Sequence, residues 1–172
     1  GSLTIGSYTY KLYDYLRADL LVEGDTLRIF SVHLQPSGIA QLRRRFQKDY
    51  NREAPVDSML GAVDRNSRIR AAQVREIRAE TDASPYPVIL AGDFNDTPMS
   101  YVYRTMAKGL NDAFSQCGSG YSHTFRGFFN TLRIDYVLSS EGFDALSYEV
   151  PTVDYSDHHP VVVRLRKNAM NN

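Results

Sequence analysis

Acidic, amide and imidazole side chains stand at the ends of strand-like segments of this sequence. The apolar run of residues 88–91 leads directly into Gly92, Asp93, Phe94 and Asn95. A short continuous apolar run is typical of a strand buried on both faces. Side chains two positions apart in an extended chain point the same way, so Asp93 and Asn95 share one side. Strand ends of layered α/β sheets often carry sites, although residues 92–96 also fit a simple polar turn.

Three further positions follow the same pattern. His33 ends the strand-like run 27–34, where a lone histidine is more often structural than catalytic. Asp135 lies in the strand-like run 133–138, which is expected to be buried, and a buried carboxylate without a partner is costly. Its partner is either the nearby Arg133 or a histidine whose tautomer and basicity the carboxylate would set. His158 follows Asp157 in an extended segment, so their side chains share one site only if the backbone turns there.

Aspartate, asparagine and histidine together favour hydrolytic chemistry on an oxyanion. Carboxylates are the ligands that Mg²⁺ prefers, usually together with substrate phosphates. Histidine and aspartate suit proton transfer to or from water and phosphate esters. The sequence has no phosphate-binding loop of the Gly-x-x-x-x-Gly-Lys-Ser/Thr type, no Gly-x-Ser-x-Gly elbow and no His-Glu-x-x-His pair.

The composition indicates one globular domain, taken here as residues 3–166. The 172 residues carry 20 basic and 20 acidic side chains, so no net charge drives non-specific binding of nucleic acid. The run Arg43-Arg44-Arg45 is either a solvated helix face or a patch that faces phosphate. The single cysteine, Cys117, excludes an internal disulfide and a thiolate metal cluster. No apolar run reaches the length of a membrane span.

The two ends of the sequence are expected to lie outside the domain. Gly1-Ser2 resembles the remnant of a removed tag, and residues 167–172 form a polar tail. We therefore expect an excised piece of a longer protein. Any targeting segment would lie upstream, and the compartment is left undetermined.

The periodicity predicts strands alternating with helices. Strands over 16–22 and 27–34 form a hairpin around a polar turn. Helices are expected over 38–51 and 64–81, the latter with Ile69, Ala72 or Gln73, Ile77 and Glu80 on one face. A helix over 100–108 follows the strand at 88–91, and a long loop at 115–131 contains a short strand at 122–125. The last strands are 133–138, 146–150 and 160–165, which completes an α/β pattern.

Five segments in this order resemble the endonuclease/exonuclease/phosphatase family. The family includes pancreatic-type deoxyribonucleases, abasic-site endonucleases, neutral sphingomyelinases and inositol polyphosphate 5-phosphatases. Each segment alone is a weak indicator of the family, but the ordered set is specific. The set most resembles the sequences of a bacterial branch common in Bacteroidetes. The segments are Val32-His33-Leu34, Gly92-Asp93-Phe94-Asn95, Thr124-Phe125, Arg133-Ile134-Asp135-Tyr136 and Ser156-Asp157-His158-His159-Pro160-Val161.

The resemblance implies a four-layer αββα sandwich of the deoxyribonuclease-like fold. It also implies hydrolysis of phosphate esters with Mg²⁺ or Mn²⁺, on a nucleic acid, a phospholipid or a small molecule. By the resemblance, Asp93 orients and deprotonates the attacking water and Asp157 is a metal ligand. Oriented by Asp135, His158 contacts phosphate or acts as base. His33 is the second histidine, while Asn95, Thr124 and Arg133 contact substrate.

One departure from the family pattern affects the expected activity. The family's first strand carries an Asn and is followed by a Gln-Glu motif with the main metal-ligating Glu. Neither motif stands in this sequence, so the resemblance covers about the C-terminal two thirds of the domain. The fold is then incomplete at its N-terminal part, and an open sheet edge invites self-association.

We expect this chain to bind metal weakly and to be a poor catalyst. A nuclease or other phosphodiesterase is the leading interpretation for the parent protein. A lipid or sugar phosphatase, a sphingomyelinase-like phosphodiesterase and a non-catalytic interaction module are the alternatives. The absence of tryptophan, with Asp96-Thr97 after Asn95, disfavours the inositol 5-phosphatases.

Overall fold

Two β-sheets and a long helix form the framework of the computed structural model, which describes residues 3–10, 14–38 and 56–168. The larger sheet has six strands in the order β1-β2-β3-β4-β6-β5, and the smaller pairs β7 with β8. The strands are β1 (Leu3–Tyr10), β2 (Tyr15–Val22), β3 (Asp25–His33), β4 (Val88–Asp93), β5 (Asn111–Asp112), β6 (Asp135–Ser139), β7 (Phe143–Glu149) and β8 (Val162–Lys167). The predicted α/β class is confirmed.

The centre of the large sheet combines antiparallel and parallel pairing. β2 and β3 form the predicted hairpin, which turns at Glu23 and Gly24, both with positive φ. β3 then runs parallel to β4, and the long helix α2 (Val56–Asp82) makes the crossover between them. β6 is antiparallel to β4.

The hydrophobic core lies between the large sheet and helices α2 and α3 (Tyr101–Met106). Alternate residues of the central strands point into it, including Phe30, Leu90 and Leu138. Val74 and Ile77 of α2 meet them and are fully buried. The opposite side of the same strands, with Ser31, Ala91 and Val137, is only partly covered.

Helix α2 is longer than predicted, and its buried face matches the predicted one at Ile77 but not at Ile69. Its buried side chains are Arg70, Val74, Ile77 and Thr81. This spacing is helical, but it is shifted from the prediction, in which Ile69 faced inward. Ile69 is instead 40% exposed, because its neighbour Arg70 is the residue that points inward.

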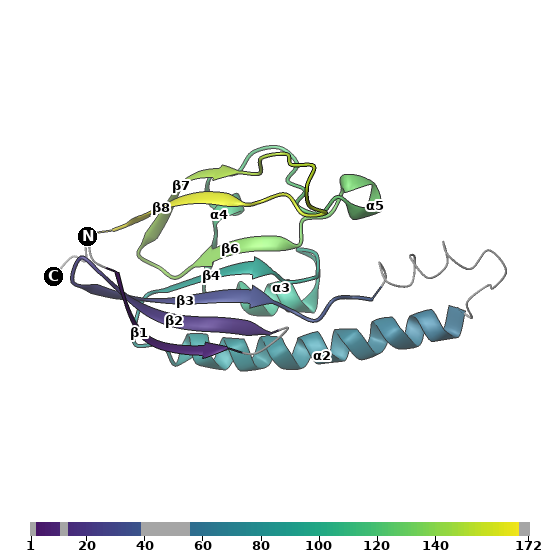
Figure 1. Ribbon diagram of the computed structural model, residues 1–172, viewed down its shortest axis with the longest axis horizontal. Coiled ribbons are helices and arrows are strands. Elements are labelled where there is room, and N and C mark those ends of the chain that lie inside the picture. Colours follow the sequence, from purple (N-terminus) through teal and green to yellow (C-terminus); the bar gives the residue numbers. More distant parts are fainter. Residues whose placement is uncertain (1–2, 11–13, 39–55, 169–172) are drawn as a thin grey trace.

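The small sheet and α2 lie on opposite long sides of the molecule (Figure 1). Helix α4 (Ala113–Cys117) packs against β7 and β6, with Phe114 against Tyr148. An ion pair between Lys167 of β8 and Asp25 of β3 connects the two sheets. The order of layers is that of an αββα sandwich, with two strands in the second sheet among the residues described.

Other predicted elements have different outcomes. The strand at 122–125 is wrong, because Phe125 forms only isolated bridges with Leu132 and His158. The 115–131 loop instead contains the end of α4 and the short helix α5 (Gly127–Asn130). Helix 38–51 and the Arg43-Arg44-Arg45 run lie outside the described residues. Within those residues, no helix is long and apolar enough to cross a membrane.

Candidate active site

Three of the predicted site residues form one row across the large sheet. His33 pairs in register with Asp93 across β3 and β4, and Asp93 pairs with Asp135 across β4 and β6. Paired residues of neighbouring strands place their side chains on the same face. The row therefore sets Asp93 between a histidine and a second carboxylate.

Gly92 permits the close approach of β4 to β3 just before this row. A Cβ at Gly92 would lie 2.0 Å from the Val32 carbonyl oxygen, and its φ is +139°. No L side chain fits such a position without backbone movement. A glycine is therefore required where the strands bring His33 and Asp93 together.

Asn95 holds the Asp93 carboxylate in place. Its backbone N–H donates to Asp93 Oδ1 at 2.7 Å, and its Nδ2 donates to Asp93 Oδ2 at 2.9 Å. The same Nδ2 donates to the carbonyl of Leu34 at 3.0 Å. Asn95 adopts φ +51°, a conformation that asparagine tolerates better than most residues. The amide thus ties the turn after β4 to the end of β3.

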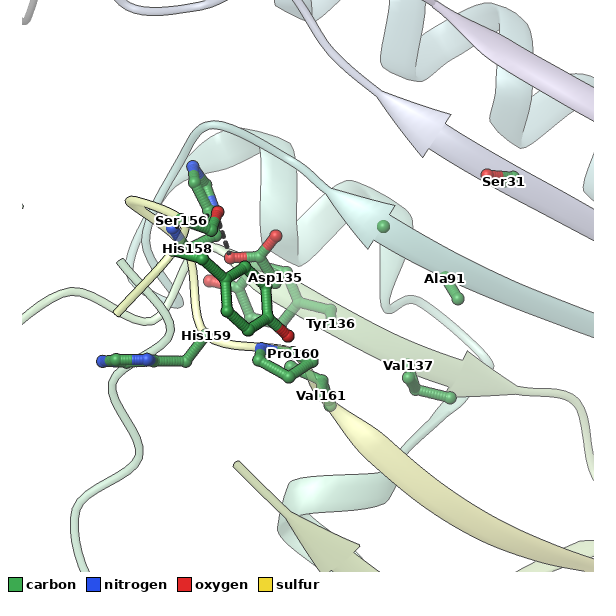
Figure 2. Close-up of a pocket in the computed structure, with 12 residues that line it drawn as sticks. Ser31, Ala91, Asp135, Tyr136, Val137, Ser156, His158, His159, Pro160 and Val161 are labelled. Atoms are coloured by element: carbon green, nitrogen blue, oxygen red, sulfur yellow. Dashed lines mark hydrogen bonds and ion pairs between the residues drawn. The ribbon is translucent and has the colours of Figure 1, made fainter. Parts of the chain in front are cut away.

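His158 is the second histidine of the site and comes from the loop before β8. Its Nδ1 lies 2.9 Å from Asp135 Oδ2, so the histidine is the partner that the carboxylate needs. Figure 2 shows these two side chains turned toward each other, whereas His159 points away. Nε2 of His158 and Nε2 of His33 both lie 3.9 Å from Asp93 Oδ2. Asp93 is therefore flanked by two imidazoles.

Thr124 connects the loop of His158 to the strand of Asp135. Its hydroxyl accepts the backbone N–H groups of Ile134 and Asp135, each at 3.1 Å. Its carbonyl accepts the N–H of His159 at 2.7 Å. Thr124 is fully buried. The contact with phosphate predicted for it stays a prediction, and the structure gives the side chain a supporting position.

The electrostatics of the site favour proton exchange near neutral pH. Burial, reinforced by the charge of Asp135, raises the pKa of Asp93 to about 7. The hydrogen bond that His158 donates to the Asp135 carboxylate raises the pKa of His158 above its ordinary value. Both pKa values are raised, and a carboxyl group that titrates near neutral pH beside an imidazole is suited to acid–base catalysis.

An open cleft of about 850 Å³ gives access to the row. One wall comes from α2 and the segment after β3, with Val63, Ser67 and Arg70. Phe125, Leu132 and Ile134 contribute an apolar part of the lining. The floor holds all the catalytic residues predicted from the sequence, namely His33, Asp93, Asn95, Asp135 and His158. A smaller cavity of about 440 Å³ lies behind Asp135 and His158 (Figure 2).

Asp93, Asp135 and His158 form the group of described side chains that can hold a metal ion. One ligand atom from each lies within 4.8 Å of the others. Two carboxylate oxygens fit a hard divalent cation. Asp157, the predicted metal ligand, lines the same cleft but is exposed and lies outside this group. Its role as a ligand stays a prediction.

Arg133 is not brought into the cleft. Its guanidinium pairs with the buried Asp112 at 2.8 Å and stacks on Phe114 and Tyr136. The structure therefore separates Arg133 from Asp135, and a substrate contact by Arg133 has no geometric support. Arg70 is a buried cleft residue that the sequence prediction did not include. Its helical spacing from Val74 and Ile77, which places it on the buried face of α2, is the sequence feature that could have identified it.

Comparison with protein families identifies one match over most of the chain. The model of the Endonuclease/Exonuclease/phosphatase family matches residues 2–158. A search of curated proteins finds no match.

Solved structures share the fold at low sequence identity. The human Nocturnin catalytic domain with bound sulfate matches with a TM-score of 0.65 and 18% identity, over 96% of this chain and 60% of that one. A mannosyl-6-phosphatase from Bacteroides thetaiotaomicron matches at 0.60 and 21%, over 88% and 56%. An endonuclease/exonuclease/phosphatase family protein from the same species matches at 0.63 and 22%, over 88% and 54%. The chain thus spans little more than half the length of these structures.

Proposed function

The chain belongs to the Endonuclease/Exonuclease/phosphatase family, and on that premise we propose that it carries the cleft of a divalent-metal-dependent phosphoester hydrolase. A phosphodiester, as in a nucleic acid, is the leading substrate class. The observation that carries the proposal is the Asp93 carboxylate, set between His33 and His158 at the floor of an open cleft.

Mg²⁺ or Mn²⁺ is the proposed cofactor, held by the carboxylates of Asp93 and Asp135. Such an ion, when bound, supplies positive charge to the phosphoryl oxygens and acidifies water. Asp93 and Asp135 are two carboxylate donors in the described part, and the Glu expected by resemblance has no counterpart in the sequence. We accordingly expect weak binding, with metal needed at millimolar levels.

Each site residue has a distinct role in the proposed reaction. Asp93, with its pKa near 7, accepts a proton from the attacking water while Asn95 fixes its orientation. His158, kept cationic by Asp135, contacts a phosphoryl oxygen. His33 is more exposed than His158 and lies on the other side of Asp93, where it is placed to protonate a leaving-group oxygen.

A sugar phosphate monoester is the second candidate substrate. One structure with the same fold is that of a mannosyl-6-phosphatase, and the hydroxyl-bearing wall with Ser37, Ser67 and Thr97 fits a polyol. The zero net charge of the chain gives DNA no general electrostatic advantage over such a small substrate.

The test measures hydrolysis with Mn²⁺ or Mg²⁺ in parallel assays. The substrates are bis(p-nitrophenyl) phosphate, p-nitrophenyl phosphate, mannose 6-phosphate and plasmid DNA. Asp93→Ala is compared with Asp154→Ala, which removes an exposed carboxylate of the His158 loop outside the cleft. We expect slow, metal-dependent diester cleavage that is lost only in Asp93→Ala.

A metal-dependent shift of the melting temperature provides a readout that needs no substrate. The shift is expected for the unmodified chain and for Asp154→Ala, and not for Asp93→Ala. Cleavage of monoesters alone would favour the second candidate. Absence of both hydrolysis and a metal-dependent shift would overturn the proposal and leave a non-catalytic interaction module.

A further inference from the structure

Helix α2 contacts the two loops of the active site through a pair of side chains one turn apart, Arg70 and Gln73. Arg70 is only 4% exposed. A buried cation is costly unless its donors are used. The use made of these donors therefore indicates what the residue does.

The first loop held by this pair follows β3 and His33. The Nη1 of Arg70 donates to the Gln35 carbonyl at 3.1 Å, and the Gln35 N–H donates to Gln73 Oε1 at 3.0 Å. Both backbone polar groups of Gln35 are thus bound by side chains of the same helix. Gln35 stands two residues after His33, so the end of β3 is tied to α2.

The second loop follows β4 and contains Asn95. The Nη2 of Arg70 lies 3.4 Å from Asp96 Oδ2, and it also donates to Ser67 Oγ within α2. Asn95 in turn bonds to the Leu34 carbonyl and to Asp93. Asn95 thus joins the two loops by its bond to Leu34. Arg70 contacts the residue that follows each of these two partners, namely Gln35 and Asp96.

We propose that Arg70 and Gln73 act as a positioning clamp, which holds His33 and the Asp93–Asn95 turn at the spacing that the cleft requires. The clamp deepens the proposed function and rests on it for its effect on catalysis. Rigid helices hold functional groups more accurately than loops do, and residues behind the reacting groups commonly set their geometry. Arg70 has the planar, multi-donor group that can bind two loops at once, which lysine does not.

The experiment combines backbone hydrogen exchange with kinetics for Arg70→Met, Arg70→Lys and Gln73→Ala. Arg17→Met is the matched control, because Arg17 also ties the sheet to α2, through Glu80, but contacts neither loop. The clamp predicts faster exchange at Leu34, Gln35 and Asn95 in Arg70→Met and Gln73→Ala, with unchanged exchange in the β4–β6 ladder. Arg17→Met should leave those three amides unchanged.

In the kinetic arm, kcat should fall by about tenfold or more while KM changes little, since misplaced groups lower the rate of the chemical step. Arg70→Lys should recover only part of the loss. Unchanged exchange at the three amides in both clamp variants would overturn the clamp. Uniformly faster exchange across the core would also overturn it, since that result marks a general packing role. If the unmodified chain hydrolyses nothing, the proposed function fails, and exchange alone still decides whether the clamp exists.

Discussion

Asp93 is the residue at which stability and function oppose each other. Burial raises its folded-state pKa to about 7 from an ordinary value of 3.8. The stability from the protonated form is therefore present below about pH 4 and is lost as the pH rises through about 7. Ionised Asp93 destabilises the metal-free fold at alkaline pH.

Asp93→Asn should accordingly stabilise the metal-free protein by about 1–2 kcal/mol at about pH 8, while removing activity. The gain in stability is smaller than the free energy that corresponds to the full pKa shift. The amide that replaces the carboxylate offers Asn95 one acceptor oxygen fewer. At about pH 4 the gain should vanish. Urea unfolding with a chelator present, at both pH values, measures the difference. An equal effect at the two pH values would contradict the assigned pKa.

Asp135 sets the protonation of both of its neighbours. It raises the pKa of His158 through their hydrogen bond and raises the pKa of Asp93 through its charge. The base Asp93 limits activity at acidic pH, and loss of the positive charge of His158 limits it at alkaline pH. Asp135→Asn also removes a proposed metal ligand, so the rate should fall. Because both pKa values fall as well, the bell-shaped profile of the remaining kcat/KM should move to lower pH. Asp154→Asn, in the same loop as His158, should not move it. A profile that stays in place or moves upward would contradict this coupling.

At the scale of elements, Gly92 fixes how β4 leaves the sheet. In Gly92→Ala the new Cβ would meet the Val32 carbonyl at 2.0 Å, at a φ of +139°. We expect a loss of about 3 kcal/mol or more in the free energy of unfolding. Gly142→Ala is the control, because Gly142 has φ +95° but open space around it, and about 1 kcal/mol is expected there. Equal losses would show that backbone strain, and not the close approach of β3 and β4, decides the position.

The elements and the site differ in how far the sequence foretells them. Alternation in β2 and β3 and the apolar run of β4 predict those strands, because their burial follows the period of their residues. The buried face of α2 is predicted only in part, because the predicted face does not include Arg70, which contacts distant in sequence hold inside. The pairing of Asp135 with His158 was one of two alternatives, since residues 23 positions apart meet only through the sheet. Nothing in the sequence next to Arg133 predicts that its side chain lies away from the cleft.

At the scale of the whole molecule, the strands missing from the family pattern are expected to leave an open sheet edge beside the hairpin and beside the last strand. β1 covers the outer edge of β2 in the large sheet. In the small sheet, β8 pairs only with β7 among the described residues. A two-stranded sheet is marginally stable and gains most from a further strand. We therefore expect weak self-association through the β8 edge.

The exposed apolar residue Val162 on β8 allows this edge to be tested. Val162 is 50% exposed, and a lysine there places a charge where a second copy would pair, as natural edge strands do. Val162→Lys should abolish concentration-dependent dimerisation in sedimentation equilibrium. Leu16→Lys is the matched control: Leu16 is 39% exposed but lies on β2, which is paired on both sides, so dimerisation should persist. Loss of the dimer in Leu16→Lys alone would place the contact on the large sheet. If the unmodified chain is a monomer at all concentrations, the expected association is wrong, and the β8 edge is protected by its own twist and charges.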